Sequence, residues 1–359
     1  MRTVLFTICL MLLLSGCSEL SQTSEEKTVK EIAENELIVT FLDVDQGDAT
    51  LLQTKDSTVL IDAGRHDRDE VVSLLKEAGV TELDLFVGTH PHADHIGQVA
   101  QVLAEFPVVE VWMSGDDHTT RTFERAIQAI AASGADYYEP RAGEEFEIGS
   151  LTIEVINPTE LTGDFHEGAI GLRMVHGEVA WLFMADIEKE IELELVDNGV
   201  NLQADVIKLG HHGSSTSSEE AFLRKVDPMY AVYSAGADNE YGHPHREVIE
   251  RIDRLNLEWY GTDLHGSIQM ISDGSSISIH TENNQQSALN EDGPSDSCIN
   301  INEASIDELT TIVHIGEERA QQLIDMRPIT NLNELTDING IGDGRLSEII
   351  EEELACLKN

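Results

Sequence analysis

The chain has 359 residues, of which 41% are hydrophobic, enough for one large domain and a second, small one. Its 68 acidic residues outnumber its 22 basic residues and give a formal net charge of −46. A surface this negative repels polyanions at long range and argues against a broad basic patch for nucleic acid.

The N-terminus has the pattern of a secretory leader. An apolar run from Val4 to Leu14 is too short to span a bilayer but suits the hydrophobic part of a signal peptide. The Leu-Ser-Gly-Cys motif that ends at Cys17 resembles the lipobox of bacterial lipoproteins. The resemblance implies a signal peptide over residues 1–17 and lipid on the Cys17 sulfur, with ordinary secretion as the alternative. Residues 18–36 are polar, which favours a flexible tether.

Short β-like runs and helical patterns then alternate from residue 37 to residue 280. Because they interleave without a strict βαβ repeat, the pattern predicts a layered α/β sandwich rather than a doubly wound sheet. Residues 281–297 contain almost nothing apolar and are predicted to be a linker, and residues 298–359 form a small, all-helical domain. The predicted strands are Leu37–Val44, Ala49–Gln53, Thr58–Ile61, Leu83–Val87, Leu151–Ile156, Ile170–Val175, Val179–Met184, Val206–Leu209 and Tyr230–Ser234, and the predicted helices are Val71–Ala78, Thr122–Ser133 and Glu188–Val196.

A cluster of potential metal ligands follows the strand predicted at Leu83–Val87. His90 and His92 lie two positions apart, so their imidazoles would point the same way on an extended backbone. Asp94 and His95 add a carboxylate and a third imidazole as the chain enters a helix. This layout suits two adjacent metal ions, the first bound by the two early histidines and the second by the later pair. No Cys-x-x-Cys pair exists, so the site must use His, Asp and Glu.

Other candidate ligands lie near the ends of later strands. Asp186 follows a predicted strand, where its carboxylate could bridge two cations or cap the next helix. His211 and His212 are adjacent, so their side chains are expected to diverge, and the sequence leaves open which of them is a ligand. The other would face the substrate or support a ligand. His166, before another strand, is a candidate third ligand of the first metal.

Two further residues are expected to assist this centre. His243 lies in a Gly/Pro turn and could donate a proton or contact a phosphate, with a plain turn residue as the alternative. Asp62 ends a strand before a glycine turn and could orient a ligating imidazole. The histidines predicted to be ordinary ones are His66, His118, His176, His265, His280 and His314.

The order of these motifs resembles the hydrolase domain of the ComEC DNA-uptake proteins, which have the metallo-β-lactamase fold. The resemblance implies a four-layer αββα sandwich over residues 37–280 with a two-metal hydrolytic centre. The family usually has glycine where Asp45 stands and asparagine where His166 stands. The long membrane-spanning region of that family is absent, so we expect a free-standing, membrane-tethered relative. The segments that carry the resemblance are Phe41–Ala49, Leu60–Gly64, His90–His95, Lys208–Ser214 and Tyr241–Pro244.

Residues 298–359 resemble the helix-hairpin-helix domain of ComEA-type DNA receptors, on the segment Ile299–Ala304 and two glycine-containing hairpins. The resemblance implies that hairpin glycines let the backbone approach a DNA phosphate, with His314 in place of the first expected glycine. A helical protein-binding module is the alternative, favoured by the few basic residues. Cys298 and Cys356 bracket the domain and could form a disulfide. The predicted DNA-binding residues are Gly316, Gly340, Ile341 and Gly342.

Together these features predict a hydrolase that is lipid-anchored at the extracytoplasmic face of the bacterial membrane and cleaves phosphodiester bonds in DNA. It would hold two divalent ions, Zn²⁺ or alternatively Mn²⁺, and a link to DNA uptake is expected. Asp94, His212 and His243 are the predicted catalytic residues. A hydrolase of small esters, lactams or cyclic nucleotides, or a non-catalytic DNA-binding lipoprotein, are the alternatives. No obligate protein partner is implied.

The net charge of −46 also predicts adaptation to high salt, because dissolved ions screen the repulsion among carboxylates. We expect the melting temperature and the activity to fall as salt is removed. Thermal unfolding followed by circular dichroism over a salt series measures the first effect. Full stability and full activity in salt-free buffer would contradict this expectation.

Overall fold

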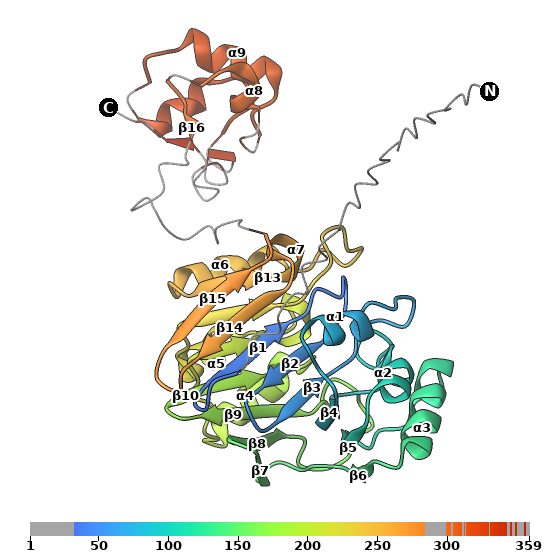
Figure 1. Ribbon diagram of the computed structural model, residues 1–359. Coiled ribbons are helices and arrows are strands. Elements are labelled where there is room, and N and C mark those ends of the chain that lie inside the picture. The colour runs from blue at the N-terminus through green and yellow to red at the C-terminus, as the bar shows by residue number, and fades with distance from the viewer. Residues whose placement is uncertain are drawn as a thin grey trace, which may run out of the picture. The chain divides into compact units, whose positions relative to one another are not determined.

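The computed structural model describes residues 32–283 and, with short gaps, residues 299–356 (Figure 1). The chain divides into two compact units, the first ending at Gln285 and the second starting at Gln286. The predicted signal peptide, Cys17, most of the tether and linker, and Cys298 lie outside the described residues. Among the residues that are described, no helix is long and apolar enough to cross a membrane.

Two mixed β-sheets form the centre of the first unit. In each sheet, the strands that come first in the chain pair in antiparallel fashion, and parallel pairing begins between β3 and β4 in one sheet and between β10 and β11 in the other. The eight-stranded sheet has the order β15 (Ile277–Thr281), β14 (Ile268–Ser272), β1 (Leu37–Phe41), β2 (Thr50–Gln53), β3 (Thr58–Ile61), β4 (Leu83–Gly88), β5 (Val108–Met113) and β6 (Asp136–Tyr138). The seven-stranded sheet has the order β13 (Glu258–Gly261), β12 (Tyr230–Tyr233), β11 (Val206–Lys208), β10 (Val179–Phe183), β9 (Gly171–His176), β8 (Leu151–Asn157) and β7 (Glu145–Ile148).

The sheets pack face to face because alternate apolar side chains of their strands point inward. Leu52 and Trp112 of the first sheet share one buried cluster with Trp181 of the second. The side chains that point the other way, such as Leu51 and Phe86, pack against helices. Strands buried on both faces read as continuous apolar runs in the sequence.

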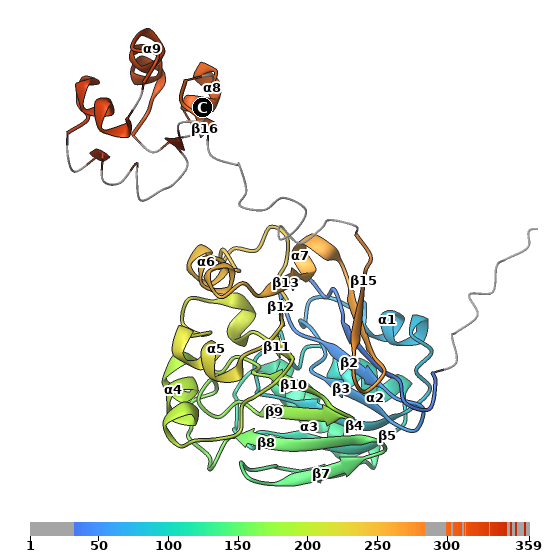
Figure 2. The same ribbon diagram turned by 90° about the vertical axis from the view of Figure 1, so that its left-hand side faces the viewer.

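Helices cover the outer face of each sheet (Figure 2). The helices α1 (Val71–Glu77), α2 (Val99–Glu105) and α3 (Arg121–Ser133) pack on the first sheet. On the other side lie α4 (Lys189–Asp197), α5 (Glu220–Val226) and α6 (Arg246–Arg254). The short α7 (Thr262–His265) follows β13. The predicted four-layer αββα sandwich is thereby confirmed.

Every strand and helix predicted in this unit has a counterpart, with ends that differ by a few residues. The predicted strand Leu37–Val44 ends earlier, at Phe41, because the chain turns there into the loop that carries Asp45. The pattern missed strands with mixed or half-exposed side chains, such as β7 and β15, because edge strands lack a continuous apolar run.

The second unit is a small helical body with its own apolar core. It contains α8 (Ile306–Leu309), α9 (Glu317–Asp325) and the 3₁₀ turn η2 (Leu332–Asp337). The prediction of an all-helical unit omitted one short pair of parallel strands, β16 (Ile299–Asn300) and β17 (Ala355–Cys356), which are too short to leave a pattern. This pair brings the ends of the unit together. The proposed disulfide still stays a prediction, because Cys298 and the Cys356 side chain lie outside the described residues.

A buried carboxylate fastens the helical layer to a loop of the second sheet. Glu192 of α4 is fully buried, and its two oxygens accept hydrogen bonds from the backbone N–H groups of Ser218 and Glu219, at 2.7 and 2.8 Å. That loop follows η1 (Gly210–Gly213). Burial raises the pKa of Glu192 to about 7.

This carboxylate should make stability fall with rising pH. The folded protein holds the proton of Glu192 between about pH 4.5 and 7, where the unfolded chain releases it, so the free energy of unfolding decreases across that window. Glu192→Gln should remove this decrease, which amounts to ~3 kcal/mol at most. Urea unfolding at about pH 5 and about pH 8 measures it, with the exposed Glu190→Gln as control. If the free energy of unfolding changed equally with pH in Glu192→Gln and in Glu190→Gln, the raised pKa would not belong to Glu192.

Candidate metal centre

The candidate ligands lie in loops that leave parallel strands of both sheets. His90 to His95 follow β4, Asp186 follows β10, and His211 and His212 follow β11. His243 lies in the loop after β12. The carboxyl ends of parallel strands meet at one edge of a sheet, so the fold gathers residues that are far apart in sequence.

Asp186 lies at the middle of this cluster and is 2% exposed. Its Oδ1 is 3.3 Å from His95 Nε2 and 3.8 Å from His212 Nε2. Its Oδ2 is 3.5 Å from His90 Nε2 and 3.9 Å from His211 Nε2. Each oxygen of one carboxylate therefore faces two imidazole nitrogens.

Two of the three groups of potential ligand atoms among the described residues share Asp186, and the third is His166, Glu188 and His211. One group is His90, His92, His166 and Asp186, and the other is Asp48, His95, Asp186 and His212, with the atoms of each group within 4.8 Å of one another. His90 Nε2 and His92 Nδ1 are 3.0 Å apart, close enough to contact one cation. A carboxylate that belongs to both groups is placed to bridge two ions.

The cluster fits metal ions because it contains buried polar atoms that have no hydrogen-bond partner in the described part of the chain. His95 Nε2, His212 Nε2 and Asp186 Oδ1 are buried without a hydrogen-bond partner among the described residues. A buried polar atom left unpaired costs free energy, and a cation contacted by these lone pairs would remove that cost. Imidazole and carboxylate donors suit zinc and similar divalent ions.

Oxygen atoms on the far side of each ring fix which nitrogen carries the proton. His95 Nδ1 lies 2.8 Å from a carboxylate oxygen of Asp62, and His212 Nδ1 lies 3.0 Å from the carbonyl oxygen of Ser234. Both oxygens can only accept, so each Nδ1 donates and each Nε2 keeps its lone pair for a cation. Asp62 lies where the sequence predicted an orienting carboxylate, and it also accepts from Thr89.

The charges of the centre reinforce one another. Burial would lower the pKa of His95, but the carboxylates of Asp186 and Asp62 outweigh it and hold that pKa well above its ordinary value. Burial would raise the pKa of Asp186, yet His95 and His212 hold it well below its usual range. Without a metal, a proton therefore stabilises the carboxylate. Metal binding would release that proton, so affinity should fall at low pH.

The expected divergence of His211 and His212 is wrong. Both residues adopt the left-handed backbone conformation, with φ of 47° and 55°, and both Nε2 atoms face Asp186. This conformation costs a non-glycine residue on the order of 1 kcal/mol or more. The left-handed turn is what allows neighbouring side chains to converge. His212 belongs to the second ligand group, whereas His211 Nδ1 contacts Glu188 at 3.2 Å.

Asp94 lies at the open side of the second group. Its side chain is 35% exposed, and its Oδ2 is 3.4 Å from His212 Nε2. Asp48 stands in the tighter group instead, but Lys208 Nζ lies 2.8 and 2.9 Å from its two oxygens, and both residues are buried. Because Lys208 neutralises Asp48, Asp94 remains the carboxylate available to a cation next to His212.

His166 lies on the side of the first group, with its ring centroid 5.0 Å from that of His92. Its Nδ1 is 3.7 Å from Glu188, whose carboxylate also contacts His211. His118, which was predicted to be an ordinary histidine, is half-buried, and its ring centroid lies 6.3 Å from that of His92.

Sequence reasoning missed three polar residues of the centre: Asp48, Lys208 and Glu188. The first two lie inside segments that carried the family resemblance, and the third lies two positions after Asp186. No local pattern distinguishes them, because their partners are distant in sequence.

His243 lies beside this cluster, its ring centroid 5.6 Å from that of His211 and 6.1 Å from that of His212. Burial and the neighbouring imidazoles lower the pKa of His243 to about 4. The exposed ring of Tyr241 stacks on it. Gln46 contacts the other edge of the ring, with Nε2 3.4 Å from Nδ1.

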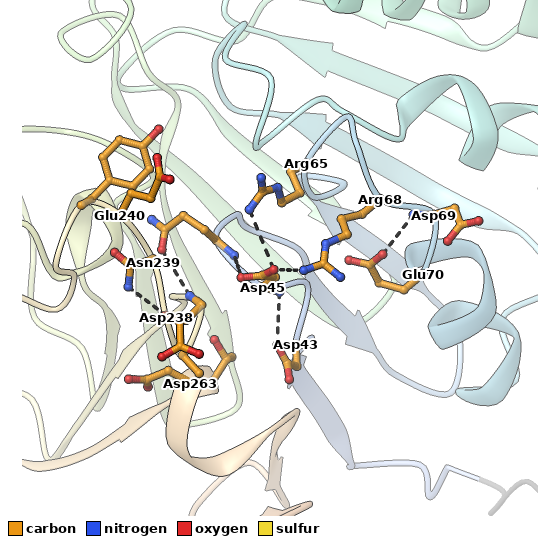
Figure 3. Close-up of a pocket in the computed structure, with 15 residues that line it drawn as sticks. Asp43, Asp45, Arg65, Arg68, Asp69, Glu70, Asp238, Asn239, Glu240 and Asp263 are labelled. Carbon is orange, nitrogen blue, oxygen red and sulfur yellow. Dashed lines mark hydrogen bonds and ion pairs between the residues drawn. The ribbon is translucent and has the colours of Figure 1, made fainter.

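An acidic cavity of about 900 Å³ adjoins His243 through Gln46 and Tyr241 (Figure 3). Figure 3 shows Asp45 between Arg65 and Arg68, and its carboxylate pairs with both guanidinium groups. Asp45 has a φ of 61°, in the left-handed region where glycine would be unstrained. The carboxylates that line the cavity outnumber its two arginines; they are Asp43, Asp45, Asp69, Glu70, Asp238, Glu240 and Asp263.

In the second unit, Gly316 precedes α9 as its N-terminal cap, and Gly340 has a φ of 86°. Arg319 joins the two hairpins, donating to the carbonyl oxygens of His314 and Asn339. The glycines at 316, 340 and 342 are exposed, as phosphate contact requires. Ile341 does not fit a DNA contact, because its side chain is 3% exposed and its N–H donates to the carbonyl of residue 338.

The model of the metallo-beta-lactamase superfamily matches residues 42–237, more than half of the chain, and that of the helix-hairpin-helix motif matches residues 295–352. The chain belongs to the metallo-β-lactamase superfamily. Membership indicates a metal-dependent hydrolase, and the expected pairing with a helix-hairpin-helix motif is confirmed.

Several relatives carry names linked to competence or nuclease activity. ComE operon protein 3 of Bacillus subtilis (strain 168) is 31% identical over 200 residues, 55% of this chain and 26% of that protein. Competence protein ComA of Neisseria gonorrhoeae is 33% identical over 245 residues, 66% of this chain and 33% of that protein. A deoxyribonuclease of Thioalkalivibrio sp. (strain K90mix) is 48% identical over 61 residues, 17% of each chain. The chain thus spans a third or less of the length of these relatives.

Removal of the shared carboxylate should lower the metal content of the centre. Asp186→Asn replaces a charged bridge with a neutral amide, so we expect bound metal to fall from two equivalents to at most one. Elemental analysis of protein dialysed against zinc and then against buffer measures this. The exposed Asp197→Asn should keep both equivalents. A wild-type protein without bound metal after this treatment would contradict the assignment.

Proposed function

We propose that this hydrolase is a two-metal phosphodiesterase that cleaves DNA on the outer side of the cytoplasmic membrane, with a role linked to DNA uptake. The observation that carries the proposal is Asp186, whose two oxygens are shared between two groups of ligand atoms. A pair of cations held by these residues would suit hydrolysis of a phosphodiester, because it would neutralise charge on the phosphoryl oxygens.

Each residue of the centre then has a role. His90, His92, His166 and Asp186 would hold the first ion, and Asp94, His95, Asp186 and His212 the second. When bound, the ions lower the pKa of a water molecule towards about 7 and neutralise charge on the phosphoryl oxygens. Asp62 keeps His95 in the tautomer that binds metal. His211 and His243, beside the ligands, are the candidates to assist the leaving oxygen.

The imidazole-rich set of donors favours Zn²⁺, with Mn²⁺ as the alternative. The helix-hairpin-helix unit supports a polymeric substrate, because exposed glycines at 316, 340 and 342 permit backbone contact with phosphates. A tethered binding unit raises the local concentration of DNA without new catalytic contacts. Relatives named for competence and as a deoxyribonuclease support the same substrate.

Location and covalent modification complete the proposal. Lipid on Cys17 would anchor the protein at the extracytoplasmic face of the membrane, and the polar residues that follow would act as a tether. In that oxidising location Cys298 and Cys356 would form a disulfide.

One observation favours a second candidate function. The cavity beside His243 is lined by more carboxylates than arginines, and such a surface repels a polyanion. A small ester, lactam or cyclic nucleotide would meet less repulsion there than a DNA strand. A purely structural metal site is disfavoured, because closed structural sites rarely use two metals and an open position.

Purified full-length protein with its metal content assayed should cleave single-stranded or double-stranded DNA. His92→Ala and Asp94→Ala each remove a ligand, so we expect the rate of cleavage to fall by at least about 100-fold. Release of fluorescent fragments from labelled DNA measures the rate, and His280→Ala, at an exposed histidine far from the ligands in sequence, is the control. Cleavage that survives both substitutions would end the nuclease proposal. Turnover of a small nitrophenyl ester without cleavage of DNA would favour the second candidate.

A further inference from the structure

The environment of His243 differs from that of the other imidazoles in the centre. Its Nδ1 faces the side-chain amide of Gln46 rather than an oxygen, with Nε2 of the amide 3.4 Å away. Both residues are buried, with Gln46 5% and His243 9% exposed. The orientation of this amide therefore decides where His243 carries its proton.

A backbone group fixes that orientation. The N–H of Gly236 donates to Oε1 of Gln46 at 3.2 Å, and a backbone N–H can only donate. The oxygen of the amide therefore faces Gly236, and the NH₂ group faces His243. Because the NH₂ group only donates, Nδ1 of His243 must accept. The neutral ring then carries its proton on Nε2.

The turn that carries His243 is held at both ends, so the ring cannot move away from Gln46 easily. The side chain of Asn239 accepts from the N–H of His243 at 2.9 Å and donates to its carbonyl oxygen at 2.6 Å. The N–H of His245 donates to the carbonyl oxygen of Gly213 at 2.9 Å. These bonds fasten the turn to the segment that directly follows His212.

His95 and His212 have the opposite arrangement. Oxygen acceptors hold the proton on Nδ1 of both rings, which leaves Nε2 free to bind a cation. His243 cannot bind a cation in that way, because its Nε2 carries the proton and its Nδ1 faces Gln46. The hydrogen bonds that the described residues make to His243 involve its Nδ1 and its backbone, and none involves Nε2. The N–H group is thus available to a substrate.

We propose that Gln46 holds His243 as a neutral imidazole protonated on Nε2, so that His243 donates a hydrogen bond to an anionic oxygen of the substrate and is not a metal ligand. This inference rests on the proposed function for the identity of that oxygen, a phosphoryl oxygen of a phosphodiester. A fixed N–H donor beside the metal ligands stabilises charge that develops on such an oxygen. Gln46 is then a positioning residue, and His211, next to Glu188, remains the candidate for proton transfer.

Nuclear magnetic resonance of the full-length, zinc-loaded protein labelled with ¹⁵N in histidine tests the tautomer directly. Long-range ¹H–¹⁵N spectra distinguish a protonated from an unprotonated ring nitrogen, and His243→Ala identifies the signals. We expect His243 to be protonated on Nε2 alone. A proton on Nδ1 of His243 in the wild-type protein would overturn the proposal, and this measurement needs neither a folded Gln46 variant nor any catalytic activity.

Gln46→Glu tests the role of the amide with nearly the same shape. A carboxylate can only accept, so it should move the proton of His243 to Nδ1 and lower kcat by about 100-fold, with a smaller change in KM. Gln203→Glu adds the same charge at an exposed position and should alter neither the tautomer nor kcat. An unchanged His243 signal in the Gln46→Glu variant would contradict the positioning role.

The metal content separates a donor from a ligand. His243→Ala should retain both zinc equivalents and lose activity, whereas loss of one equivalent would overturn the proposal. If the wild-type protein cleaves neither DNA nor a nitrophenyl phosphodiester, the proposed function fails. In that case the tautomer measured by nuclear magnetic resonance still tests where His243 carries its proton. The zinc content still tests whether His243 is a metal ligand.

Discussion

A buried carboxylate must be neutralised, and Asp186 meets this need with imidazoles from both sheets. His90 and His95 follow a strand of the first sheet, whereas His211 and His212 follow a strand of the second. The carboxylate therefore links the two halves of the sandwich at their rim. Asp62 and the carbonyl of Ser234 keep the lone pairs of two of these rings turned towards it.

Strain in the backbone is the cost of that convergence. His211 and His212 are both left-handed, and Asp45 is left-handed where glycine would be unstrained. Each such residue costs on the order of 1 kcal/mol or more, and the surrounding structure must stabilise it. The buried cluster between the sheets and the hydrogen bonds of Glu192 to the loop after His212 provide that support. Left-handed conformations of non-glycine residues are found mainly at functional sites.

The fold and the clustering of the first candidate ligands could be predicted because their signals are local. Apolar runs such as Leu83–Val87 mark buried strands, and His90 to His95 are close in sequence. The other residues of the centre contact partners that are far away in the sequence. Lys208 contacts Asp48 across 160 positions and Gln46 contacts His243 across 197, which no pattern along the chain can show. The convergence of His211 and His212 depends on a backbone angle that the residue types do not specify.

The strong negative charge of the chain opposes the approach of a polyanion. Arg319 and Arg327 of the second unit donate to carbonyl oxygens of that unit, which limits their use as phosphate ligands. At the metal centre Asp48 is already neutralised by Lys208. Two divalent ions would bring four positive charges there, which match the four negative charges of Asp62, Asp94, Asp186 and Glu188. High salt screens the repulsion from remote carboxylates far more than it weakens direct contacts between ions. An acidic protein can therefore still bind a phosphate group at its bound cations.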